Sequence, residues 1–335
     1  MIYGSWALAF NLLNMAILAF IVANILVSVV FFLVKNKLQD YTVSSRKSLL
    51  WLFVLSPWLV ALSVTFFFCM PFQSTSSFIW LTKLVHWHHQ NSFDFLSWHS
   101  VSLITFIVFS CYIVLLKMIV LYKNHHQIRL LRALSTLDIT NNKQVYVIES
   151  PIPTAFTAGL IKPSCYISTG LIEKLSVGDI EIIIQHELAH LHHRDPLKKW
   201  LFSFLAVYFF TYIKQLLISK MSLSMEHDAD AFLVENQKKS RQHQLYKVAG
   251  TLVKFTKLAA NYAMHPRCKN ESHNNELFVH FCRQSLEQRV MHLLSDKQFK
   301  VFPKKIVLVT TFILTLVSIT SVDSIHHTIE ILFSH

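Results

Sequence analysis

Long uninterrupted runs of apolar residues are the strongest pattern in this chain. Four runs are long enough to cross the hydrocarbon core of a bilayer, which is about 30 Å thick and takes about 20 helical residues. In approximate numbers they cover residues 5–34, 49–70, 101–122 and 306–322. The first run is too long for a signal peptide and no basic segment precedes it, so we expect it to remain as a transmembrane helix. The pattern therefore predicts a mainly α-helical membrane protein with four transmembrane helices.

Composition and charge support this interpretation. The chain is 53% hydrophobic and only 15% charged, whereas an ordinary soluble domain is about 25% charged. The formal net charge of +12 could indicate nucleic-acid binding, but it could also come from basic residues on the cytoplasmic side of transmembrane helices. The positions of the charges decide between these two explanations.

Basic residues gather on one side of the predicted helices. Clusters of lysine and arginine follow the first and third runs and precede the fourth, whereas residues 71–96 carry only Lys83 and the segment after Val322 carries none. By the positive-inside rule, both termini lie outside and the region between the third and fourth runs is cytoplasmic. We therefore expect an inner (cytoplasmic) membrane protein that contacts the lipid bilayer, with no direct binding of nucleic acid.

This topology divides the chain into three parts. Residues 1–122 hold three transmembrane helices, residues 123–304 form a cytoplasmic domain, and residues 305–335 hold the fourth helix and a short external tail. A fifth apolar stretch, at about residues 200–213, is shorter than a typical transmembrane helix. We expect it to form a helix that lies against the membrane or dips into it.

The cytoplasmic part contains the sequence "HELAH", in which His186, Glu187 and His190 form an HExxH motif. Positions four residues apart lie on one face of a helix, so both imidazoles can reach one zinc ion. The glutamate between them can then take a proton from a water at the open coordination position. Ser176 is a suitable N-cap for this helix, and Asp179 stands three residues later in an approximate capping-box position.

A third ligand is expected in "SMEHDADAF", residues 224–232. Glu226 and Asp230 are four residues apart, so Glu226 can bind the metal while Asp230 accepts the second N–H of a ligating histidine. His227 and Asp228 are rival ligands, although His227 lies about 100° around the helix from Glu226. A three-ligand site also requires the stretch at 200–213 to return to the side of the membrane from which it came.

Upstream of the motif, the sequence predicts a pair of strands. "QVYVI" (144–148) and "SCYIS" (164–168) are strand-like and are separated by proline and glycine turns. An open strand edge beside a zinc ion is a suitable place to hold an extended peptide, although a purely structural hairpin would have the same pattern. The candidate substrate-edge residues are Thr154, Ala155, Phe156, Thr157, Ala158 and Gly159.

These motifs resemble the membrane zinc metallopeptidases of the BlaR/MecR antirepressor type. The resemblance rests on "QHELAHLHHRDP", on "EHDAD", on "ESPIPTAFTAGLIKPSCYIS" and on "LEQRVMHLL" before the last apolar run. It implies a gluzincin-like α+β zinc peptidase domain inserted between the third and fourth transmembrane helices, with one Zn²⁺ per chain and Asp195 supporting a ligating histidine. It also implies a cytosolic protein substrate, in particular a winged-helix repressor that is cleaved in signal transduction.

One departure from that family concerns the sensor. The antibiotic receptors of the family carry a penicillin-binding domain after the fourth transmembrane helix, whereas only about a dozen residues follow Val322 here. We therefore expect a stand-alone form with a different trigger. One candidate trigger is metal binding by His86, His88 and His89, although an ordinary membrane-edge loop is the simpler interpretation.

Two alternatives remain open. The segment "TAFTAG", residues 154–159, also resembles HtpX-type membrane peptidases, so an HtpX-like or CAAX-type peptidase of membrane-protein quality control or processing is the main alternative. The other is a non-catalytic signalling scaffold, which the intact Glu187 disfavours because a structural zinc site needs no general base. A homodimer is compatible with each of these functions.

Overall fold

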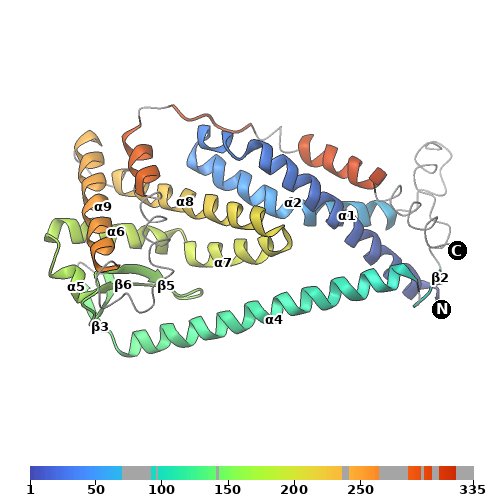
Figure 1. Ribbon diagram of the computed structural model, residues 1–335, viewed down its shortest axis with the longest axis horizontal. Coiled ribbons are helices and arrows are strands. Elements are labelled where there is room, and N and C mark those ends of the chain that lie inside the picture. Colours follow the sequence, from blue (N-terminus) through green and yellow to red (C-terminus); the bar gives the residue numbers. More distant parts are fainter. Residues whose placement is uncertain are drawn as a thin grey trace.

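The computed structural model describes residues 1–69, 92–95, 97–140, 143–235, 241–263, 286–295, 298–303 and 309–321. Within these residues the chain is mostly helical, with a small sheet at the end opposite the N-terminus (Figure 1). The external cluster of His86, His88 and His89 lies outside the described residues, so its proposed metal binding stays a prediction.

Along the sequence, the strands of the larger sheet come after the long apolar helices and before the helix that carries the HExxH motif. In chain order they are β1 (Ile2–Tyr3), α1 (Ser5–Val34), η1 (Lys37–Asp40), α2 (Val43–Cys69), β2 (Ser92–Phe93), α4 (Trp98–Ala133), β3 (Thr136–Thr140), β4 (Lys143–Ile148), β5 (Ala155–Ala158), β6 (Ser164–Ser168), α5 (Thr169–Ile172), α6 (Val177–His192), α7 (Asp195–Leu205), η4 (Ala206–Tyr208), α8 (Thr211–Glu235) and α9 (Arg241–Ala263). Residues 286–294 and Val309–Ser321 are also helical.

Three helices, α1, α2 and α4, are long and apolar enough to cross a membrane. The bounds of α1 agree with the prediction, whereas α2 begins at Val43 rather than near 49 and α4 runs on to Ala133 rather than ending near 122. An apolar run indicates only the part of a helix that is suited to the hydrocarbon core. The backbone hydrogen bonds of the helix continue beyond that run into polar sequence, so the helix is longer than the run. Helix α4 therefore joins the predicted transmembrane and cytoplasmic parts without a break.

The fourth transmembrane helix stays a prediction. Val309–Ser321 is an apolar helix, but it is shorter than a bilayer requires, and the residues on either side of it lie outside the described part. Its Ile319 packs against Ala19 and Ala23 of α1 and Val60 of α2. The described portion thus lies with the predicted transmembrane helices.

The prediction of one helix at about residues 200–213 is wrong. Helix α7 ends at Leu205, a short 3-10 turn follows, and Phe209 is extended with ψ 155° before α8 begins at Thr211. The chain reverses there, so α7 and α8 lie side by side (Figure 1). The hydrophobicity of the stretch gave no sign of this break, because it contains no proline or glycine. The chain does return to the helix that carries the HExxH motif, as a three-ligand site requires.

The first part of α8 packs into the apolar helices. Leu217, Met221 and Met225 are buried in one cluster with Leu50 and Val54 of α2. Burial of this face fixes the position of α8 along α2, and the next turn of α8 carries Glu226. Helix α2, a candidate membrane helix, and the helix that carries the predicted third ligand are therefore parts of one packed unit.

The sheet has four strands in the order β3-β4-β6-β5. Strands β4 and β6, the two predicted strands, are parallel, and β5 pairs antiparallel with β6, so the alternative of a simple hairpin formed by the two strand-like segments is wrong. The segment between them has room for a third strand, and that strand, β5, takes the edge. One face of the sheet carries Cys165 and Ile167, which pack against apolar side chains of α6.

Candidate metal centre

Helix α6 begins at a polar cap. Ser176 Oγ accepts a hydrogen bond from the backbone N–H of Asp179 at 3.3 Å, which satisfies one of the free donors at a helix start. The Asp179 carboxylate accepts further hydrogen bonds from Thr251 and Lys254 of α9, at 2.7 and 2.9 Å. Burial raises the pKa of Asp179, but the hydrogen bonds from Ser176, Lys254 and Thr251 outweigh this effect and lower the pKa to about 2. Asp179 thereby ties the start of α6 to α9.

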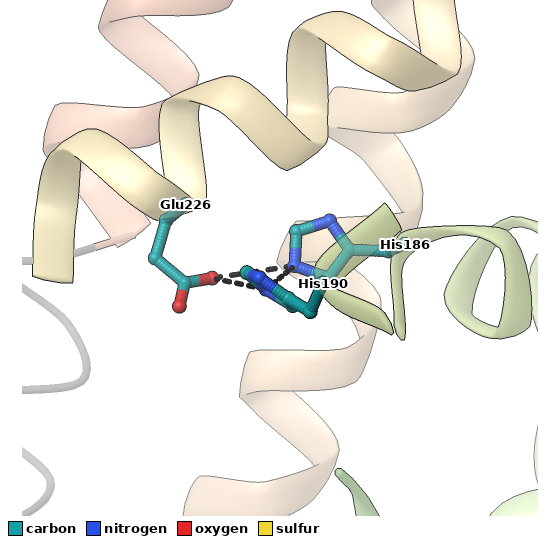
Figure 2. Close-up of side chains that lie close together, drawn as sticks. All are labelled: His186, His190 and Glu226. Atoms are coloured by element: carbon teal, nitrogen blue, oxygen red, sulfur yellow. Dashed lines mark hydrogen bonds and ion pairs between the residues drawn. The ribbon is translucent and has the colours of Figure 1, made fainter. Parts of the chain in front are cut away.

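The predicted ligands His186, His190 and Glu226 lie together (Figure 2), with ligand atoms within 4.8 Å of one another. His186 Nε2 is 3.2 Å from both His190 Nε2 and Glu226 Oε2, and His190 Nε2 is 3.6 Å from that same oxygen. Two ligands of a tetrahedral zinc, each bound at about 2.0–2.1 Å, lie about 3.3 Å apart. The donor set and its spacing thus suit a zinc ion, with the fourth position left for water or substrate.

Asp195 supports His190. Its Oδ2 lies 2.7 Å from His190 Nδ1, and the Asp195 side chain is fully buried. Arg194, between α6 and α7, has φ 54°, a left-handed conformation that is uncommon for residues other than glycine. This turn separates the two helices and places the first residue of α7 beside the last part of α6. Burial lowers the pKa of His190, but hydrogen bonds with Asp195 and Glu226 outweigh it and raise the pKa to about 9.

Asp230 lies behind His186. Its Oδ1 is 3.1 Å from His186 Nδ1, so that His186 Nε2 is the nitrogen directed at Glu226. Arg289, in the helix at 286–294, contacts both Asp230 oxygens, with Nε at 2.9 Å and Nη2 at 2.6 Å. Burial raises the pKa of Asp230, but the charge of Arg289 and the hydrogen bond with His186 lower it to about 2. The carboxylate is therefore ionised and able to accept from the histidine.

Arg289 was missed in the sequence. Its Nη1 also lies 3.3 Å from Glu226 Oε2, so one guanidinium contacts the third ligand and the residue that orients the first. The segment "LEQRVMHLL" that contains it carried part of the family resemblance, but a contact with a partner 59 positions away leaves no local periodicity to find. Only burial of the Asp230 carboxylate could have indicated that a cation was required.

The rival ligands point elsewhere. His227 Nδ1 lies 3.1 Å from Arg46 Nη1, and the His227 ring stacks on His292 at 4.0 Å between centroids. Asp228 contacts Lys47 and lies 3.2 Å from His193 Nδ1. Burial, with smaller effects from the nearby His292 and Arg46, lowers the pKa of His227 to about 3. Neither rival lies in the group formed by the two motif histidines.

Glu187 faces the edge strand. Thr157 Oγ1 on β5 lies 2.9 Å from Glu187 Oε2 and at the same distance from the Glu187 backbone oxygen. Strand β5 contains four of the predicted substrate-edge residues, and Thr154 and Gly159 border it. Gly159 has φ 112°, and a Cβ there would meet Lys162 O at 2.8 Å, so glycine is needed for this turn. Peptide binding along β5 stays a prediction.

Comparisons with known proteins agree with this geometry. Residues 123–285 match the profile of peptidase family M48. "Protease HtpX" of Legionella pneumophila (strain Corby) is 34% identical over 79 residues, which are 23% of this chain and 28% of that protein. "Protease HtpX homolog 2" of Methanosarcina mazei is 35% identical over 65 residues, or 19% of this chain and 22% of that protein.

A third relative, "Protease HtpX homolog" of Moorella thermoacetica, is 32% identical over 79 residues, or 23% of this chain and 26% of that protein. The chain therefore spans roughly a quarter of the length of the curated relatives it matches. The apolar helices and the His186–His190–Glu226 group are consistent with a membrane metallopeptidase. Residues 123–285 are therefore similar in sequence to peptidase family M48.

Proposed function

We propose that this protein is an HtpX-like membrane metallopeptidase that hydrolyses peptide bonds of protein substrates. The observation that carries the proposal is the triangle of His186, His190 and Glu226 ligand atoms, with separations of 3.2, 3.2 and 3.6 Å. Buried carboxylates lie behind both histidines, Asp195 at 2.7 Å from His190 Nδ1 and Asp230 at 3.1 Å from His186 Nδ1, and such groups usually fix the ring orientation of a metal ligand. A single Zn²⁺ per chain would be held by these three side chains.

The residues around the ligands have separate roles in the proposed reaction. Zinc at this position would supply Lewis acidity and lower the pKa of a water used for attack on the peptide carbonyl. Glu187 would take the proton from that water and return it to the leaving amine, as a general base and then a general acid. Thr157 holds one Glu187 oxygen and so limits the directions in which the carboxylate can point.

The HtpX-type function is favoured over the antirepressor function. The relatives named above are HtpX proteases and homologues, and nothing in these comparisons supports cleavage of a winged-helix repressor. The scaffold alternative is disfavoured because Glu187 is present and is held beside the ligands by Thr157. Placement of the catalytic region in the cytoplasm, on the inner membrane, rests on the basic clusters in the sequence.

Zinc content and proteolysis in matched variants test the proposal. The protein is purified in detergent, its zinc is measured, and cleavage of an unfolded protein such as casein is followed. We expect Glu187→Gln to keep its zinc and lose at least about 100-fold in cleavage rate, because general acid–base catalysis supplies 10²–10⁴-fold. Glu181→Gln is the matched control, since Glu181 is an exposed residue of the same helix. Full activity in a zinc-loaded Glu187→Gln protein would refute the mechanism.

A further inference from the structure

Arg46, in the first turns of α2, is a buried arginine whose contacts are incomplete. The residue is only 4% exposed. Its Nη1 donates to His227 Nδ1 at 3.1 Å, so the histidine must accept at that atom. Its Nε and Nη2 are buried and have no hydrogen-bond partner among the described residues. No carboxylate in the described part of the chain pairs with this guanidinium.

The two unpartnered nitrogens form one edge of the guanidinium group. This edge presents parallel N–H bonds that match the two oxygens of a carboxylate or phosphate. Leaving a buried charge without a partner is costly, and buried arginines are normally paired. The free edge therefore indicates an acceptor that comes from outside the described chain.

The surroundings of Arg46 are also basic. Burial lowers the pKa of Lys220 on α8, and the nearby charges of Arg46 and Lys35 lower it further. The adjacent acid, Asp228, is already used by Lys47. Two aromatic rings, those of His292 and Phe299, also lie near Arg46. His292 stacks on His227, and Arg46 Cζ lies 5.7 Å from the centroid of Phe299. Arg46 and Lys220 therefore make this position positively charged, and no carboxylate among the described residues pairs with Arg46.

Three separate segments enclose this position. Besides α2 and α8, residues 298–303 run beside the start of α2, through a hydrogen bond from Thr42 N to Lys300 O at 2.9 Å and one from Phe302 N to Ser45 Oγ at 3.1 Å. Arg46 also stands just before the apolar part of α2, which begins at Leu49. Phospholipid headgroups lie at the same depth as the end of a transmembrane helix.

We propose that Arg46 binds a phosphate-type oxyanion at the junction of α2, α8 and residues 298–303. The oxyanion accepts from Nε and Nη2 of Arg46, with Lys220 close enough to contribute charge. It is either the phosphate of a membrane lipid or free phosphate. Because His227 follows Glu226 directly, occupation of the site would also steady the turn of α8 that carries the third metal ligand. Binding of an oxyanion at this site does not require the protein to be proteolytically active.

Two binding measurements on the purified full-length protein test this proposal and separate the two sources. The first follows thermal unfolding in detergent as inorganic phosphate is added at constant ionic strength. The second counts phospholipid phosphorus retained per chain after extensive washing with detergent. Arg46→Gln removes both the charge and the guanidinium edge with its parallel N–H bonds. Arg129→Gln is the matched control, because Arg129 is an exposed arginine of α4.

A free-phosphate site predicts a saturable rise in melting temperature in the original protein and in Arg129→Gln, which is lost in Arg46→Gln. A lipid site predicts no response to phosphate and a retained phospholipid that only Arg46→Gln loses. Should Arg46→Gln fail to fold, Arg46→Lys serves instead, with an affinity at least about tenfold weaker because lysine lacks the bidentate edge. Equal responses in all variants, or no response in any, would overturn the proposal.

Discussion

Arg289 binds both carboxylate oxygens of Asp230, with Nε at 2.9 Å and Nη2 at 2.6 Å. Asp230 in turn lies 3.1 Å from His186 Nδ1, so the arginine holds the group that orients a metal ligand. This pair joins the helix at 286–294 to α8 and through it to α6. The candidate metal centre therefore includes a segment that lies outside the HExxH and Glu226 motifs.

We predict that Arg289→Gln weakens zinc binding. Arg289 fixes the position of Asp230 behind His186, and loss of such support behind a metal ligand typically lowers metal affinity about 10–100-fold. Competition with a fluorescent zinc chelator measures the affinity. Glu287→Gln, on the exposed face of the same helix, should leave it unchanged.

A double-mutant cycle shows whether Arg289 acts through Asp230. If it does, Arg289→Gln combined with Asp230→Asn should weaken zinc binding much less than the sum of the two single changes. Strict additivity would show that Arg289 acts on the site by its contact with Glu226 instead. A folded Arg289→Gln protein with full zinc affinity would contradict the prediction altogether.

We predict that Thr157→Val lowers turnover without loss of zinc. The hydroxyl lies 2.9 Å from Glu187 Oε2, and a hydrogen bond to a charged group contributes about 1.5–3 kcal/mol. A loss of that size corresponds to roughly 10–100-fold in rate. Thr157→Ser restores the hydroxyl and should restore kcat, which an effect of side-chain shape alone would not do.

Thr154→Val is the control for changes along the edge segment. The Thr154 hydroxyl reaches only the backbone oxygen of Ile152, at 3.5 Å, and has no contact with Glu187 among the described residues. We expect kcat of Thr154→Val to stay within about twofold of the original. An equal fall in kcat for both valine variants would show that the edge strand, not the Glu187 contact, is responsible.

The grouping of His186, His190 and Glu226 could be predicted because its parts are local. His186 and His190 are one helical turn apart, as are Glu226 and Asp230, so spacing alone places each pair on one face. Steric and hydrogen-bonding preferences of single residues likewise predict the Ser176 cap. The apolar runs mark α1, α2 and α4 because lipid contact requires a continuous stretch of apolar side chains.

The supporting contacts could not be predicted in this way. Thr157 and Glu187 are 30 positions apart, and Arg289 and Asp230 are 59 apart, so their pairing depends on how whole elements pack. The parallel pairing of β4 and β6 depends on a third strand inserted at the edge, and the break at Phe209 depends on packing against other helices. Local pattern carries no information on either.

We predict that Asp179→Asn lowers stability in a pH-dependent manner. The pKa of Asp179 is about 2 in the folded chain and 3.8 for an ordinary aspartate. Because the folded pKa is depressed, the carboxylate's contribution is fully present above about pH 4 and is lost as pH falls through about 2. At pH 7 the variant should lose about 1–3 kcal/mol, the value of hydrogen bonds to a charged group.

Thermal unfolding of the metal-free protein between pH 2 and about pH 7 measures this effect without interference from zinc release. The original protein should lose stability as pH falls from about 4 to 2, and Asp179→Asn should show a flatter curve in that window. Glu181→Gln, an exposed residue on the same helix, serves as the control. Parallel curves for the original protein and Asp179→Asn would contradict the assigned role.

The last prediction concerns the turn between α7 and α8. Tyr208 packs its ring against Phe20 of α1 and Trp58 of α2, with centroids 5.5 and 5.3 Å apart. Phe20 lies near the middle of the apolar run at residues 5–34, and Trp58 lies near the middle of the run at residues 49–70. Phe210, just beyond, is 63% exposed, so a large apolar side chain projects outward at the level of the candidate membrane helices α1 and α2. We predict that this turn is embedded in the bilayer although α7 and α8 do not cross it.

Cysteine labelling in native membranes tests the embedding. In a background whose own cysteines are replaced by serine, Phe210→Cys should react with a membrane-impermeant maleimide at least about tenfold more slowly than Val177→Cys, because a thiolate must be in water to react. Val177 is 83% exposed at the start of α6, in the predicted cytoplasmic part of the chain. Denaturation in detergent should make the two rates equal. Rapid labelling of Phe210→Cys in intact membranes would place the turn in water, and the exposed aromatic side chains there would then need a protein partner rather than lipid.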